Sequence, residues 1–288
     1  MIVRAAPTGV ASWHLTSLEF AVLLDRIGRD RVPFPFSWTT CARTAADLRA
    51  EREAARRRLG DRSLLAAASL LGGPGLQVTA CGVESGDRRV RIRAATAYSA
   101  IPLHSDRPPA FALHSDRPPA FPLHSDRPPA FPLAVVVVQD PGPTSDTGGT
   151  VHVHAVPPER MTHTLTAALP HRRAGRVTPS SVSRDDVVRA PSSHLHDSRD
   201  DTDRERVIHI LDGPREGLGE IVVGHGGDGP LEAIAGRRWI DAVGDGRYLV
   251  HATDVVTVLP ATAQTIATAL DDEIRRAGAV PPVTGTRS

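Results

Sequence analysis

Three near-identical ten-residue units constrain what this chain can fold into more than any other feature. The units LHSDRPPAFA, LHSDRPPAFP and LHSDRPPAFP occupy residues 103–132 and differ only at Ala112, where the other copies have proline. Each unit contains a Pro-Pro pair, and proline lacks the N–H that helices and inner strands need. The repeat therefore predicts an extended, polyproline-like loop at 101–133 between two strands.

Two interpretations of this loop stay open. In the first, the loop is a docking arm whose evenly spaced phenylalanines contact a partner: Phe111, Phe121 and Phe131. In the second, it is a tolerated surface insertion, because loops absorb added residues at a small thermodynamic cost. The near-identity of the copies indicates a recent tandem expansion and is compatible with both.

Around the loop, the order of the expected elements is loosely repeated. Thr16 and Glu19 have the spacing of a capping box that begins a helix, and Gly28 is suited to end it. The other expected elements are helices at 44–59 and 63–71, strands at 76–83, 89–98, 134–139 and 150–156, a helix at 158–169, a polar linker at 171–200, a helix at 201–211, strands at 220–223, 231–243, 247–252 and 255–259, and a final helix. This order predicts an α+β protein with two related halves around an antiparallel sheet.

The same order sets the expected boundaries. An N-terminal half covers 1–170 and includes the loop, a C-terminal half covers 171–276, and 277–288 forms a flexible tail. Within the first half, the two prolines in 32–36 predict an extended segment. In the strand at 89–98, arginines alternate with Val90 and Ile92, which predicts one buried and one wet face.

Composition excludes several classes of function. The chain has 34 basic and 33 acidic residues, which argues against a generic nucleic-acid-binding protein. The first residues lack a signal-peptide core, and no run approaches the ~20 apolar residues of a membrane span. Only Cys41 and Cys81 are present, which fits a reducing compartment. We therefore expect a cytoplasmic protein.

Two patterns could carry chemistry. The segment Gly224–Gly229 spells G-x-G-x-x-G, but Pro230 and a strand-like run follow it, which favours a glycine-rich hairpin over a nucleotide-binding helix start. His152 and His154 share one face of a strand and could begin a metal site, although spacing fixes no further ligand. No catalytic residue, metal or cofactor is predicted. The alternative function, a small-molecule or metal-binding enzyme that uses this turn or this histidine pair, stays open.

Several segments resemble the EspG family of ESX secretion-associated proteins. They are WHLTSLEF at 13–20, PFPF at 33–36, WID at 239–241, GRYLV at 246–250 and VTVLP at 256–260, with a further similar stretch at 210–223. The order of the elements agrees over nearly the whole chain, the repeat excepted. The resemblance implies a quasi-two-fold α+β fold, with a central antiparallel sheet flanked by two helical subdomains.

It also implies a cytosolic chaperone that binds PE–PPE-like helical heterodimers and keeps them soluble for a type VII secretion system. Such a chaperone is not an enzyme and needs no cofactor. The candidate contacts are Trp239, Asp241, Arg247, Tyr248 and Val250 on the last strands, together with the loop phenylalanines Phe111, Phe121 and Phe131. For Trp239, Tyr248 and Val250, ordinary core packing is the competing interpretation. A structural subunit of a larger assembly is a further alternative, and the oligomeric state stays open.

Overall fold

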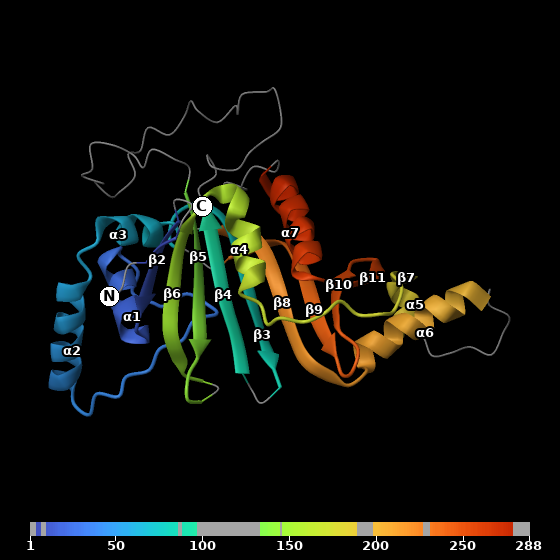
Figure 1. Cartoon of the computed structure of the whole chain (residues 1–288), viewed down its shortest axis with the longest axis horizontal. Coiled ribbons are helices and arrows are strands. Elements are labelled where there is room, and N and C mark those ends of the chain that lie inside the picture. Colours follow the sequence, from blue (N-terminus) through green and yellow to red (C-terminus); the bar gives the residue numbers. More distant parts are fainter. Residues whose placement is uncertain are drawn as a thin grey trace, which may run out of the picture.

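A computed structural model of the chain describes residues 4–6, 10–85, 88–96, 133–144, 146–188, 198–226 and 231–278. Within these residues, eleven strands form one sheet, and each pairing of neighbouring strands is antiparallel. Helices gather at both ends of the sheet and over its middle (Figure 1). The expected α+β class with a central antiparallel sheet is confirmed.

The elements on the N-terminal side are β1 (Arg4–Ala6), β2 (Val10–Leu15), α1 (Ser17–Arg26), α2 (Ala45–Arg58), α3 (Arg62–Ser69), β3 (Gly75–Glu84), β4 (Arg88–Thr96), β5 (Ala134–Pro141), β6 (Gly148–Val156), the 3-10 turn η2 (Pro158–Arg160) and α4 (Met161–Ala167). The capping box at the start of α1 is present, since the Glu19 N–H donates to the Thr16 hydroxyl at 3.1 Å. Gly28 follows the helix with φ 81°, as its type suggests.

The elements on the C-terminal side are β7 (Ser180–Ser183), α5 (Arg184–Val188), α6 (Ser198–Asp212), β8 (Arg215–Gly226), β9 (Glu232–Ala242), β10 (Arg247–Ala252), β11 (Val255–Pro260) and α7 (Ala263–Gly278). The final helix buries Ile266, Leu270 and Ile274, the three residues that share one helical face in the sequence. α7 ends at Gly278, so it includes the first two residues of the segment 277–288 that the sequence assigns to a tail. Residues 279–288 lie outside the described residues.

The strand order across the sheet is β1-β2-β6-β5-β4-β3-β8-β9-β10-β11-β7. The two parts of the chain meet where β3 pairs with β8, from Gly75 opposite Gly226 to Glu84 opposite Gly217. The repeat 103–132 lies outside the described residues. Its flanking strands, however, are neighbours, because Thr96 at the end of β4 pairs with Ala134 at the start of β5.

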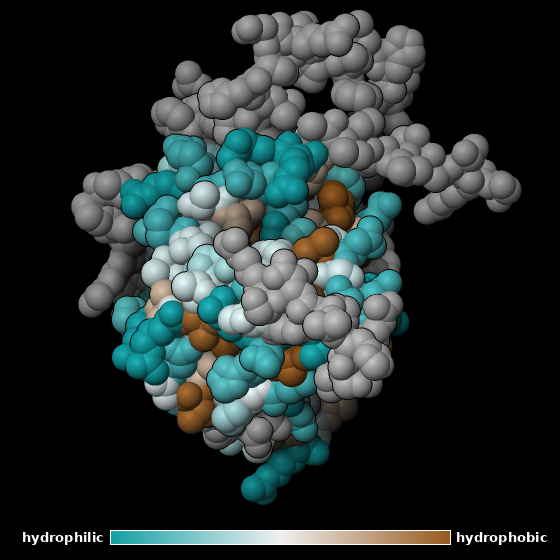
Figure 2. All heavy atoms as spheres, turned by 90° about the vertical axis from the view of Figure 1, so that its right-hand side faces the viewer, coloured by the Kyte–Doolittle hydropathy of each residue, from teal (hydrophilic) through white to brown (hydrophobic). Residues whose placement is uncertain are grey.

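Three hydrophobic clusters hold the helices to the sheet. One joins α4 and α7 to the middle of the sheet, through Leu165 and Leu270 among others. The second joins α1, α2 and α3 to β2, β5 and β6, and the third joins α6 to β9, β10 and β11. Viewed from the end that carries α5 and α6, the surface is largely hydrophilic, with small separated hydrophobic patches (Figure 2).

Three expectations need correction. The segment 32–36 is not simply extended, because it forms a turn in which Phe36 N–H donates to the Pro33 carbonyl and the Phe34–Pro35 bond is cis. The linker 171–200 is not wholly irregular, since it contains β7 and α5. β7 adds to the sheet because its backbone pairs with β11. The arginine face of β4 is wet only at Arg89, because Arg91 and Arg93 are buried. Of the helices that the described residues form, none is long and apolar enough to cross a membrane.

Candidate partner-binding surface

The middle of the sheet has two unlike faces, because successive residues of a strand point to opposite sides. One face packs against α4 and α7 and carries Val78, Ile221 and Trp239. The other packs against α1–α3 at one end and α6 at the other, in two separate clusters. Between these clusters lies a surface that we call the central strip, formed by side chains of β4, β3, β8 and β9: Arg89, Arg91, Arg93, Gln77, Thr79, Cys81, Val83, Glu220, Val222 and Arg238.

Arg93 lies at the buried end of the central strip, where it is 8% exposed. Its Nε donates to Gln77 Oε1 at 3.0 Å, its Nη2 donates to the same oxygen, and its Nη1 donates to the Phe34 carbonyl at 2.7 Å. These acceptors are neutral. Burial, with repulsion from Arg29, lowers the pKa of Arg93 to about 10, so the guanidinium stays charged at neutral pH.

Arg91 continues the row toward solvent. It is also buried, and its Nη1 donates to the Thr147 carbonyl at 3.2 Å. Burial lowers its pKa, the nearby Arg89 lowers it further, and Asp146 opposes both effects. Arg89 itself is exposed. Positive charge is thus concentrated on the β4 side of the central strip.

A surface cavity of about 410 Å³ opens beside these arginines. Its polar lining includes Arg89, Arg91 and Asp146, and its apolar lining includes Val83. At the rim, Phe34 is 67% exposed although it is a large hydrophobic side chain. Arginine beside an exposed aromatic ring is a combination that is enriched in protein-binding surfaces.

The β8–β9 side of the central strip differs in charge. Glu220 and Arg238 lie directly opposite each other in the register, and both are exposed. Because they carry opposite charges, this side is balanced. Val222 is half-buried, and Gly236 opposite it is exposed, so the middle of this side presents apolar atoms and backbone.

The five strand residues expected to contact a partner are all buried: Trp239, Asp241, Arg247, Tyr248 and Val250. Trp239 lies on the α4/α7 face, over two glycines that face each other across β3 and β8. A Cβ at Gly219 would collide with the indole ring, and one at Gly82 would come within 2.6 Å of it. The glycines therefore form a slot that fits the ring, and Trp239 is part of the core.

Asp241 and Arg247 form a buried bidentate ion pair, with donor–acceptor distances of 2.6 and 2.8 Å. Tyr248 accepts a hydrogen bond from the Val177 N–H at 2.9 Å and donates one to Asp245. Burial, reinforced by Asp245, raises the pKa of Tyr248. Val250 packs in the α6 cluster. These side chains fix the last strands, whereas Phe111, Phe121 and Phe131 lie outside the described residues.

The histidine pair lies at the β2 end of the α4/α7 face. His152 Nε2 is 2.8 Å from Asp140 Oδ2, and its ring meets the edge of His14 at 4.7 Å between centroids. His154 Nδ1 is 2.9 Å from the Ser12 hydroxyl. Burial, followed by repulsion from His152 and His14, lowers the pKa of His154. The two histidines do share a face, as the sequence predicts.

Neither alternative chemistry gains support from this arrangement. In the parts of the chain that the structure describes, no three His, Cys, Asp or Glu side chains are placed to hold a metal ion. Gly224 and Gly226 lie within β8, and the next described element is β9, its antiparallel neighbour. The described residues on either side of 227–230 therefore contain no helix start that could bind a pyrophosphate. The turn at 227–230 itself lies outside the described residues.

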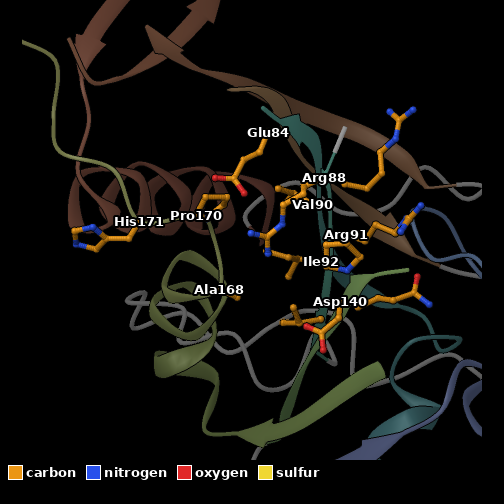
Figure 3. Close-up of a pocket in the computed structure, with 13 residues that line it drawn as sticks. Glu84, Arg88, Val90, Arg91, Ile92, Asp140, Ala168, Pro170 and His171 are labelled. Atoms are coloured by element: carbon orange, nitrogen blue, oxygen red, sulfur yellow. The ribbon is translucent and has the colours of Figure 1, made fainter. Parts of the chain in front are cut away.

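A second surface cavity, of about 300 Å³, lies on the α4/α7 face near the ends of β4 and β5 (Figure 3). Ile92 and Ala168 belong to its apolar wall, while Arg88 and His171 lie at its polar rim. Glu84 also lines it and accepts a hydrogen bond from Arg172 at 3.1 Å. Both cavities combine arginines with carboxylates: Glu84 and Asp140 line this one, and Asp146 lines the cavity beside Arg89.

The sequence did not point to the central strip, although it contains the signal. The alternation Arg89-Val90-Arg91-Ile92-Arg93 correctly predicts that one side of β4 is apolar. On its arginine side, Arg91 and Arg93 are buried. The turn at 32–36 contacts Arg93, a long-range contact that no local pattern encodes. Two separate segments were the available clue: the arginines that alternate with apolar residues at 89–93, and the Pro-Phe-Pro-Phe segment at 33–36.

A family model described as the EspG family matches residues 16–272, which is most of the chain and spans every element from α1 to the body of α7. A search of curated proteins found no matching relative.

Proposed function

Because the chain belongs to the EspG family, whose role is that of a chaperone associated with type VII secretion, we propose that it works in the cytoplasm on PE–PPE-like substrates. In this proposal, the chain binds a PE–PPE-like helical heterodimer and keeps it soluble until secretion. The observation that carries the proposal is the family match over 16–272, combined with a sheet whose central strip is left between two helical clusters.

The central strip supports this role in physical terms. A partner with an exposed apolar tip aggregates unless a complementary surface covers that tip. The strip offers apolar side chains next to fixed charges, as protein-binding surfaces commonly do. The role requires neither a catalytic group nor a cofactor, so a non-enzymatic function remains our prediction.

We also infer that the two halves are related by a quasi-two-fold axis at the β3–β8 pair. From this pair outward, the strand order β3, β4, β5, β6, β2 parallels the order β8, β9, β10, β11, β7. In chain order, and apart from the additional β1 of the first half, each half has a strand, helices, four strands and a helix. α4 and α7, which end the two halves, pack against each other. This supports halves at 1–170 and 171–276, each with a helical subdomain.

The residues expected to contact a partner take two different roles in the proposal. Trp239, Asp241, Arg247, Tyr248 and Val250 contribute to partner binding by holding β9 and β10 in place, since their side chains are buried. The phenylalanines of the repeat, Phe111, Phe121 and Phe131, are proposed as direct contacts. Their loop starts and ends at the paired residues Thr96 and Ala134, at one edge of the β4–β5 pair.

Co-expression tests the proposal. The tagged chain is produced with a PE–PPE heterodimer, and the soluble fraction and co-elution of the heterodimer are measured with and without the chain. We expect the heterodimer to be soluble and to co-elute only when the chain is present. A chain that retains no heterodimer but carries a bound metal or nucleotide would replace the proposal with the enzyme alternative.

A deletion of 103–132 decides the role of the repeat in the same assay. It leaves 97–102 and 133 to connect strands whose ends already pair, so we expect the sheet to fold. Thermal unfolding checks that it does. Loss of the heterodimer from a folded deletion variant identifies a docking arm, whereas full retention identifies a tolerated insertion.

A further inference from the structure

The central strip carries its charge asymmetrically, and this asymmetry specifies what can bind there. On the β4 side, Arg89, Arg91 and Arg93 lie in one row, each two residues from the next on the same face of the strand. On the β8–β9 side, Glu220 and Arg238 balance each other. Asp146, which lines the same cavity, offsets part of the charge of this row. A ligand that covers the strip therefore meets an excess of positive charge on the β4 side only.

The positive charge of the row is held in place. Arg93 is fixed by neutral acceptors, the Gln77 amide and the Phe34 carbonyl, so its charge is solvated by dipoles and is not cancelled by a carboxylate there. A buried charge acts through a lower effective dielectric than a solvated one and is screened less by salt. Its field therefore adds to that of Arg89 at the mouth of the cavity.

Apolar groups lie within the same site. The cavity beside Arg89 is lined by Val83 and has the exposed ring of Phe34 at its rim. Across the strip, Val222 is only half-buried. A purely acidic peptide would leave these groups uncovered, whereas a ligand with carboxylates next to apolar side chains would match both features.

We propose that the central strip binds its partner through carboxylates: acidic side chains at the tip of a helical substrate dock beside Arg89 and Arg91, and its apolar side chains cover Phe34, Val83 and Val222. This inference rests on the proposed function and adds the chemistry of the contact and the orientation of the partner. The acidic side of the tip faces β4, and its uncharged side faces β8 and β9.

Neighbouring arginines of one strand supply a matched pair of variants. Arg89 lines the cavity at the central strip, while Arg88 is also exposed but lies opposite Glu84, on the α4/α7 face, and does not line that cavity. Both arginines line the cavity of Figure 3. Arg89→Glu and Arg88→Glu change the net charge of the chain by the same amount. Binding of the co-purified PE–PPE heterodimer to the immobilised full chain is measured for the wild type and both variants, at about 50 and about 300 mM NaCl.

We expect R89E to weaken binding by roughly tenfold or more, because it places like charges together, and R88E to change it by less than about twofold. Wild-type binding should weaken as salt rises, and that dependence should shrink in R89E. Phe34→Ala, which keeps the carbonyl that Arg93 uses, should weaken binding without altering the salt dependence. Thermal unfolding shows that each variant is folded.

Equal binding by R89E and the wild type would overturn the inference while leaving the chaperone role intact. Equal weakening by R88E and R89E would also overturn it, because the effect would then belong to net charge or to the cavity of Figure 3. If the wild type binds no heterodimer at either salt concentration, the proposed function fails first, and this inference fails with it.

Discussion

Two buried arginines in this sheet are stabilised in opposite ways. Arg247 on β10 is 2% exposed and forms a bidentate pair with Asp241, a buried carboxylate. Arg93 on β4 is 8% exposed and donates to an amide and a peptide carbonyl. The first pair is locally neutral, whereas the second site keeps a full positive charge beneath the surface.

The difference shows how one sheet separates structural from interaction surfaces. A buried ion pair holds two strands together and presents little field to solvent. A buried cation with neutral partners contributes less to stability and leaves its charge available to a ligand. The α4/α7 face around Arg247 is therefore the structural side of the sheet, and the central strip around Arg93 is the binding side that we propose.

Removing the paired arginine should have the largest effect. Arg247→Met leaves Asp241 buried, with the guanidinium of Arg172 3.9 Å away as its nearest remaining cation among the ion pairs of the described residues. We expect a loss of about 3–5 kcal/mol in the free energy of unfolding, measured by urea denaturation. The exposed Arg238→Met is the control and should change it by less than about 0.5 kcal/mol. A loss below about 1 kcal/mol for R247M would remove the basis of the comparison.

Closing the slot under Trp239 should have the next largest effect. Gly219→Ala places a methyl group against the indole ring, and we expect a loss of about 1–3 kcal/mol from overpacking. Gly236→Ala is the matched control, because the nearest atom to its Cβ would be a carboxylate oxygen of Glu220 at 3.7 Å. Similar stabilities for the two variants, compared in one urea series, would show that the face around Trp239 is less tightly packed than the structure indicates.

Removing Arg93, whose hydrogen-bond acceptors are neutral, should lower the free energy of unfolding by less than removing Arg247 does. Arg93→Met leaves two neutral oxygens without a donor but also removes a buried charge, so we expect a loss of about 1–2 kcal/mol. The measurement is the same urea titration. A loss as large as that of R247M would mean that Arg93 is a structural residue of the same kind, and the contrast between the two sites would not hold.

The smallest effect concerns a group that gains charge only at acidic pH. Burial, His152 and His14 lower the pKa of His154 in the folded chain below its ordinary value of 6.5. The unfolded chain therefore binds more protons as the pH falls through 6.5, so stability should decrease there. Tm measured between pH 7.5 and 5.5 should fall less in His154→Gln than in the wild type. Equal slopes would show that His154 does not contribute.

Local patterns predicted most elements of the fold. The capping box at Thr16 and Glu19 and the apolar face of α7 each depend on residues close together in the chain, and each is confirmed. β2 and β7 escaped prediction because they are short strands at the sheet periphery, stabilised by pairing with β6 and β11 more than by their own composition.

The candidate site was less accessible to sequence reasoning. Trp239 and Tyr248 were expected to contact a partner because they lie in segments that resemble the EspG family, but their slots are formed by glycines and strands distant in the chain. The burial of Arg93 depends on Phe34 and Gln77, which come from two other elements. Contacts of this kind are properties of the assembled sheet and have no local signature.

The pairing of Thr96 with Ala134 has a consequence for how the number of repeat units can change in evolution. The repeat leaves and re-enters the sheet at two neighbouring points, and these points do not depend on how many ten-residue units lie between them. Replication slippage that adds or removes one unit therefore keeps the register of β4 and β5. Copy number becomes a character that can vary between close lineages, and selection can act on it separately from the fold.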